Sequence, residues 1–135
     1  MNEAIKNILE RRSIRKYKTD PVPKDLLETL VECGKYAATA RGIQPWFFSV
    51  VTDRAVLDRI AKANRDLILS LPDGPMTERA KDPNFDNFYH APAAIVISGA
   101  TGNNEEYTIA DCANAGSGLS GTPSRFPAIK SKRSP

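Results

Sequence analysis

Hydrophobic residues recur at helical spacing in four stretches of this chain, and two short apolar runs lie between them. In residues 2–10, the apolar positions lie one and four residues apart, which places them on one helical face. A second stretch begins after Pro23, which suits the first turn of a helix, and continues to about Ala37. A third follows Asp53, whose side chain is of the type favoured at an N-cap. These three faces carry Ala4, Ile5, Ile8 and Leu9, then Leu26, Leu27, Leu30, Val31 and Gly34, then Val56, Leu57, Ile60, Ala61, Asn64, Leu67, Ile68 and Leu71.

The two apolar runs have the composition of β-strands. Residues 46–52 (WFFSVVT) combine aromatic and β-branched side chains, so they predict a buried strand with Trp46 and Phe48 packed into the core. Residues 93–98 (AAIVIS) form a second apolar run, which predicts a central strand of the sheet. Between the third helix and this strand, the prolines and glycine of residues 72–87 predict a loop with one helical turn near Glu78. Helices and strands together place the chain in the α+β class.

The composition changes near residue 115. A fourth helix is predicted from Asn103, with Tyr107 and Ala110 facing inward, and is expected to end near Ala115. In residues 116–135, 12 of 20 residues are Gly, Ser, Pro or Thr, and no apolar period continues. Such a segment buries too little surface to offset the cost of ordering its backbone, about 1–2 kcal/mol per residue. We therefore divide the chain into a domain at 1–115 and a low-complexity, disordered or non-native tail at 116–135.

The charge distribution limits the classes of partner. The formal net charge is +3, but the last acidic residue is Asp111, and residues 1–111 hold 15 bases against 16 acids. The basic surplus belongs to the tail, so neither nucleic acid nor a membrane surface is an expected partner. No apolar run approaches the roughly 20 residues that span a bilayer. Cys33 and Cys112 lack metal-ligand spacing, so we expect no metal and a reducing cytoplasm.

The chemistry-bearing residues gather in two segments, and the first follows the N-terminal helix. It contains Arg11, Arg12, Ser13 and Arg15 within five positions. Guanidinium groups bind phosphate through charge-assisted, often bidentate hydrogen bonds, and a serine hydroxyl adds a donor. The alternative is a solvated basic end of the helix, because cations favour a helix C-terminus by about 0.3–1 kcal/mol.

The second segment is residues 38–46 (ATARGIQPW), which ends in Gln-Pro-Trp as the first strand begins. Together the two segments resemble the N-terminal half of a flavin-dependent nitroreductase, and the resemblance covers about residues 4–111. It implies an α+β nitroreductase-like fold with a central mixed sheet flanked by helices, and an FMN cofactor. Gly42 stands where the family usually has Asn, which removes one side-chain contact to the flavin. The FMN-binding residues that the resemblance implies are Arg11, Arg12, Ser13, Arg15, Thr39, Ala40, Gly42 and Gln44.

The resemblance also implies an activity and an assembly. A family member would pass electrons from NAD(P)H through FMN to a nitroaromatic, quinone or similar acceptor by a ping-pong mechanism. The expected assembly is a homodimer with FMN at the subunit interface, so partner residues complete each site. No side chain is assigned a catalytic role, including His90, the only histidine.

The C-terminal half of the family is not recognisable after about residue 115. The change in composition falls inside a predicted helix rather than at a domain boundary, which favours a reading-frame change or a truncation over a natural disordered tail. The alternative function is therefore an inactive, truncated flavin-binding remnant, or a dimerising fragment without catalysis.

Overall fold

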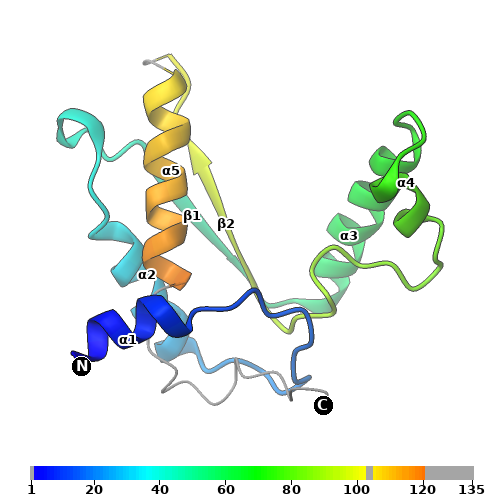
Figure 1. The fold of residues 1–135 in the computed structure, drawn as a ribbon, viewed down its shortest axis with the longest axis horizontal. Helices are drawn as coiled ribbons and strands as arrows, with labels where there is room; N and C mark the ends of the chain where they lie inside the picture. The colour runs from blue at the N-terminus through cyan, green and yellow to red at the C-terminus, as the bar shows by residue number, and fades with distance from the viewer. Residues whose placement is uncertain (1, 103–104, 121–135) are drawn as a thin grey trace.

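A computed structural model of the protein describes residues 2–102 and 105–120. Figure 1 shows a body built from α1, α2, α5 and a two-stranded sheet, from which α3 and α4 project to one side. The elements in chain order are α1 (Glu3–Glu10), α2 (Lys24–Lys35), the 3₁₀ turn η1 (Ala40–Gly42), β1 (Trp46–Val51), α3 (Arg54–Leu69), α4 (Pro75–Ala80), β2 (Ala94–Gly99) and α5 (Glu105–Ser120). No helix of the described residues is long and apolar enough to cross a membrane.

The two strands pair antiparallel, from Trp46 opposite Gly99 to Val51 opposite Ala94. Both predicted strands are thus confirmed to within a residue or two, but the first is not a buried strand as predicted, because Trp46 is the one buried residue of β1. The prediction that the second is a central strand is wrong for the described residues, because the sheet has two strands and each has one unpaired edge. Val96 is exposed on β2, as Phe47 is on β1. The apolar run therefore reflects high β-propensity and does not indicate burial on both faces.

The core of the body lies where α2 and α5 pack together beside the sheet. The buried α2 face carries Leu26, Leu27 and Leu30, as its helical period predicts. Trp46 is buried from β1, and the Phe48 ring packs against Gly34, where a Cβ atom would lie 2.9 Å from Phe48 Cε1. The predicted packing role of the two aromatic residues is confirmed.

The α3–α4 pair forms its own small apolar cluster. Asp53 caps α3 as predicted, because its carboxylate accepts a hydrogen bond from Val56 N at 3.0 Å. Leu57 is 1% exposed, and Ala61 and Ala80 are also buried. The helical turn predicted near Glu78 is α4.

The last helix differs from its prediction at its C-terminal end and in its orientation. It does not end near Ala115, because α5 continues to Ser120. The predicted inward orientation of Tyr107 and Ala110 is also wrong: both residues are exposed, and Asp111 and Ala115 face inward instead. Residues 121–135, most of the predicted tail, lie outside the described residues.

Packing against α2 explains why α5 continues through its glycines. A Cβ atom on Gly118 would lie 3.3 Å from the Cys33 carbonyl oxygen and 3.7 Å from Gly34 Cα. The two backbones approach closely at this point, and only a residue without a side chain fits there comfortably. The glycines that weaken the helix locally thus allow the tertiary contact that stabilises it.

The apolar face of α1 lies in solvent. The helix forms as predicted, and Asn2 caps it by accepting a hydrogen bond from Ala4 N at 2.8 Å. None of its residues is buried, however, and Ile8 is 72% exposed. An amphipathic helix gains most of its stability by burying its apolar face, so this face is suited to contact another chain or segment.

Candidate functional site

The basic segment after α1 has an extended backbone, since the helix ends where Arg11 adopts φ −57° and ψ 133°. The Arg12 guanidinium folds back over this end, donating from Nη1 to the Leu9 carbonyl at 2.9 Å and to the Arg11 carbonyl at 2.8 Å. Arg12 thus closes the C-terminus of the helix, which is the structural role considered as the alternative for this segment. Its neighbours Ser13 and Arg15 are exposed, as is Arg11.

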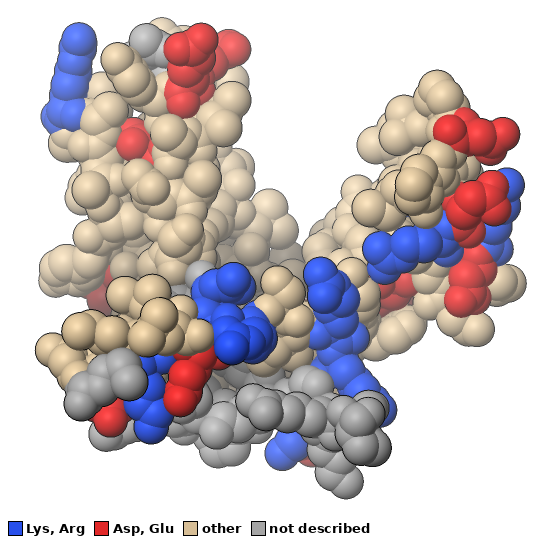
Figure 2. All heavy atoms as spheres, in the orientation of Figure 1, with Lys and Arg blue, Asp and Glu red and all other residues tan. Residues whose placement is uncertain are grey.

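Arg11 and Arg15 form no ion pair with any carboxylate of the described residues. On the face drawn in Figure 2, Lys and Arg side chains gather over the coil that follows α1. Two guanidinium groups four residues apart without an acidic partner are suited to bind an anion.

Tyr89 connects this segment to α4. Its hydroxyl accepts a hydrogen bond from the Arg79 guanidinium, with the Nη2 atom at 3.4 Å. The Arg79 guanidinium first, and the Arg15 guanidinium second, lower the pKa of the Tyr89 phenol. Tyr89 has a positive φ of 53°. Sequence reasoning missed this residue, because a tyrosine in a loop carries no pattern that distinguishes it.

His90 follows Tyr89 and has a φ of 55°. The His90 ring is exposed, and its Nδ1 lies 3.3 Å from a carboxylate oxygen of Asp86. The Asp86 side chain is buried. Its two carboxylate oxygens accept hydrogen bonds from Phe88 N at 2.7 Å and from His90 N at 3.0 Å, one each. Asp86 therefore organises the turn, and His90 lies on its outer side.

The second candidate segment forms a tight loop around η1. Arg41, Gly42 and Gln44 have positive φ values of 58°, 68° and 52°. Gln44 N donates to the Thr39 hydroxyl at 3.3 Å, so the loop closes on itself. Residues Thr39, Ala40, Gly42 and Gln44 are thereby brought together, as the sequence predicts.

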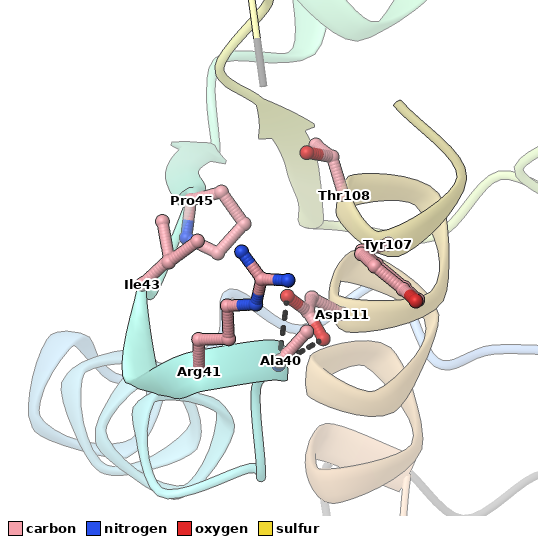
Figure 3. A pocket seen from close by; sticks show the side chains of 7 residues that line it. All are labelled: Ala40, Arg41, Ile43, Pro45, Tyr107, Thr108 and Asp111. Carbon is pink, nitrogen blue, oxygen red and sulfur yellow. Dashed lines mark hydrogen bonds between the residues drawn. The ribbon is translucent and has the colours of Figure 1, made fainter. Parts of the chain in front are cut away.

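Asp111 anchors this loop from α5. The side chain is 4% exposed, and its two carboxylate oxygens accept a hydrogen bond from Ala40 N at 3.0 and 3.2 Å. A cavity of about 130 Å³ opens beside this contact, lined by Ala40, Arg41, Ile43, Pro45, Tyr107, Thr108 and Asp111. Figure 3 shows the Arg41 side chain and Asp111 both directed toward this cavity. Sequence reasoning missed the role of Asp111. The signal that could have found it is its position four residues before Ala115, a spacing that places both residues on one helical face.

The two candidate segments do not meet within one chain. In Figure 1, α1 and the coil after it lie toward the opposite end of α5 from the loop that carries η1. The sequence thus identifies two groups of residues that lie far apart in the fold.

Comparison with known proteins decides which fold this is. The family model described as "Nitroreductase family" matches residues 8–120 of the chain. The chain belongs to the nitroreductase family. The nitroreductase-like α+β fold expected from the sequence is therefore confirmed, and the described residues contribute one antiparallel strand pair to it.

Solved nitroreductases share the arrangement of the elements. A nitroreductase from Bacteroides fragilis with bound FMN superposes with a TM-score of 0.82 at 26% identity over 90% of this chain and 64% of that chain. A protein from Parabacteroides distasonis, described as a putative NADH dehydrogenase/NAD(P)H nitroreductase, superposes with a TM-score of 0.67 at 31% identity. The match covers 90% of this chain and 61% of that chain.

Curated relatives match shorter regions. An NADH dehydrogenase of Thermus thermophilus is 44% identical over 55 residues, which is 41% of this chain and 27% of that protein. A putative NADH dehydrogenase/NAD(P)H nitroreductase of Archaeoglobus fulgidus is 36% identical over 63 residues, which is 47% of this chain and 36% of that protein. The chain therefore spans less than two thirds of the length of these relatives.

The residues present in this chain are of the types that suit an FMN cofactor. A flavin mononucleotide presents a phosphate, and Arg11 and Arg15 offer two exposed guanidinium groups that lack carboxylate partners in the described part of the chain. Loop 39–44 offers close backbone approach at Gly42, where no atom lies within 4 Å of the position of a Cβ. Within the described residues, no group of three or more His, Cys, Asp or Glu side chains could hold a metal ion.

Proposed function

We propose that this chain is an FMN-dependent oxidoreductase that passes electrons from NAD(P)H to a nitroaromatic, quinone or similar acceptor. FMN, when bound, supplies the electron transfer of a ping-pong reaction, in which reductant and acceptor use the site in turn. The proposal rests on residues 11–15, called the arginine segment below, in a chain of the nitroreductase family. Arg11 and Arg15 are exposed in this segment and have no carboxylate partner among the described residues. A reducing cytoplasm is the proposed location, supported by the free thiols of Cys33 and Cys112.

The residues of this chain divide the binding task. Arg11, Ser13 and Arg15 hold the phosphate and place positive charge beside the cofactor, where it favours the reduced, more negative state. Thr39, Ala40, Gly42 and Gln44 shape the surface that faces the ring, and Gly42 presents backbone without a side chain.

We further propose that each site is completed by a second copy of the chain. The arginine segment and loop 39–44 lie toward opposite ends of α5 in one chain, so a single molecule does not bring them to one ligand (Figure 1). A two-fold dimer would place the arginine segment of one protomer against the loop of its partner. The exposed apolar face of α1 supports an interface at this helix.

The test of the function is flavin retention followed by turnover. The full chain is mixed with FMN, separated by gel filtration, and its visible absorbance and elution volume are recorded. NADH or NADPH is then added with a nitroaromatic or quinone acceptor, and nucleotide oxidation is followed. We expect a yellow dimer that oxidises at least one nucleotide, and a colourless protein that FMN does not load would contradict the proposal.

The alternative function is a flavin-binding or dimerising fragment without catalysis. One observation favours it: the described sheet has two strands with unpaired edges, and large apolar side chains such as Phe47 and Ile109 lie in solvent. A yellow dimer that never oxidises NADH or NADPH would establish this alternative in place of the enzyme.

Replacement of Ile8 by glutamate tests the interface. Because Ile8 is largely exposed, Ile8→Glu is expected to leave the folding of one chain intact. Burying its charge in a dimer is costly, so the variant should elute as a monomer and lose FMN, since each site needs both protomers. Gel filtration with light scattering measures the mass.

The matched control is Leu67→Glu, an exposed leucine on α3 that is expected to leave the dimer intact. If Ile8→Glu elutes at the same mass as the unmodified chain, α1 does not form the interface.

A further inference from the structure

The loop that carries Thr39, Ala40, Gly42 and Gln44 has an unfavourable backbone. Arg41 and Gln44 are not glycine, yet both adopt the left-handed region, at φ 58° and 52°. A residue other than glycine in this region is unfavourable, so this conformation persists only where surrounding structure maintains it.

The hydrogen bonds inside the loop are long. Gly42 N donates to the Thr39 carbonyl at 3.2 Å, Ile43 N to the Ala40 carbonyl at 3.3 Å, and Gln44 N to the Thr39 hydroxyl at 3.3 Å. These lie at or beyond the long end of the ordinary range for N–H donors. These hydrogen bonds are therefore weak and do not by themselves fix the loop in one conformation.

One group outside the loop holds it. Within the residues that the structure describes, only the Asp111 carboxylate hydrogen-bonds residues 39–44 from another element, at 3.0 and 3.2 Å to Ala40 N. Asp111 is itself fixed, because it is 4% exposed on the inner face of α5, four residues before the fully buried Ala115. Figure 3 shows the carboxylate reaching from the helix to the start of η1. A buried carboxylate that accepts a backbone N–H is one of the stronger hydrogen bonds in a protein.

We infer that Asp111 is a positioning residue for the flavin site: its carboxylate holds loop 39–44 in the left-handed conformation that faces the cofactor. This inference rests on the proposed function for the identity of the ligand, and on the geometry for the role of Asp111. Asp111 is expected to touch neither FMN nor substrate.

The experiment reads the loop and the ligand separately. Arg41 is exposed within the loop, so trypsin cleaves after it only when the loop leaves its compact conformation. The rate of cleavage after Arg41, followed by mass spectrometry of all peptides that end at Arg41 in the absence of FMN, measures loop opening. FMN affinity of the full chain is measured by quenching of flavin fluorescence.

Three variants test the same hydrogen bond. Asp111→Ala removes the acceptor. Ala40→Pro removes the donor, and Thr39 already has the extended backbone, φ −127° and ψ 151°, that a following proline favours. Asp111→Asn keeps an acceptor oxygen of the same size. We expect Asp111→Ala and Ala40→Pro to speed cleavage after Arg41 at least about fivefold and to weaken FMN binding about tenfold, which corresponds to the loss of one hydrogen bond of about 1.4 kcal/mol. Asp111→Asn should restore most of both.

The control is Asp53→Ala, which removes another carboxylate that accepts a backbone N–H, at the N-cap of α3. It removes a helix cap without touching the loop, so cleavage after Arg41 should not change beyond the general loss of stability.

Each outcome decides the inference. Unchanged cleavage in both Asp111→Ala and Ala40→Pro overturns it, and so does faster cleavage with unchanged FMN affinity, because the loop would then open without affecting the ligand. If the unmodified chain binds no FMN, the proposed function fails instead, and cleavage after Arg41 still shows whether Asp111 holds the loop.

Discussion

Replacing Arg11 and Arg15 together by glutamine is expected to weaken FMN binding about a hundredfold, because two charge-assisted hydrogen bonds to phosphate are lost at about 1.5–3 kcal/mol each before partial compensation. Both side chains are exposed, and neither pairs with a carboxylate in the described ranges, so the thermal midpoint should stay near that of the unmodified chain. Fluorescence titration with FMN measures the affinity.

Arg59→Gln combined with Lys62→Gln is the matched control, since it removes two positive charges from the exposed face of α3. Lys62 forms an exposed ion pair with Asp66, which contributes little to stability. The control separates a local phosphate contact from a change in net charge. An FMN affinity within about twofold of the unmodified value in the Arg11/Arg15 variant would exclude this segment as the phosphate site.

Replacing Gly99 by alanine is expected to destabilise the fold by about 1–3 kcal/mol, the usual cost of overpacking. A Cβ atom at this position would overlap the Thr108 Cγ2 methyl and lie 3.2 Å from the Cys112 sulfur. The α5 helix therefore crosses the end of β2 at a distance that only glycine permits. For a chain of this size the thermal midpoint should fall by about 5–15 °C, measured by circular dichroism.

Two further variants locate the cause of this effect. Thr108→Ser removes the overlapping methyl group, so adding it to Gly99→Ala should recover part of the lost stability. Gly116→Ala places a Cβ at an ordinary contact distance of 3.6 Å from Ile97 Cδ1 and should be neutral or slightly stabilising in a helix. If Gly99→Ala is no more destabilising than Gly116→Ala, the close approach of helix and strand is not a constraint.

In the proposed dimer, the two halves of the candidate site would depend on each other through chain pairing rather than through contacts within one chain. Such pairing would account for Arg11 and Arg15 lying in solvent in one chain and still contributing to a specific site. It also predicts that FMN binding and dimer formation are linked, because a ligand that binds only the dimer stabilises it by mass action.

Local sequence patterns predicted the elements whose stability is decided locally. The helical period of α2 identified Leu26, Leu27 and Leu30 as its buried face, and Asp53 was recognised as the cap of α3. The aromatic and β-branched run of β1 identified its strand because such side chains suit a pleated surface. The Arg-x-Ser-x-Arg and Gln-Pro-Trp segments, taken together, indicated the family.

The tertiary structure decided what depends on residues far apart in the chain. The composition after Ala115 predicted the end of α5 there, but the close contact of Gly118 with Gly34 and Cys33 allows α5 to pack on α2 and to continue. The hydrogen bond from Ala40 to Asp111 joins residues 71 positions apart. Periodicity indicates only which face of an element is apolar. The close approach of two backbones and the pairing of a buried carboxylate depend instead on which elements pack against each other in the folded chain.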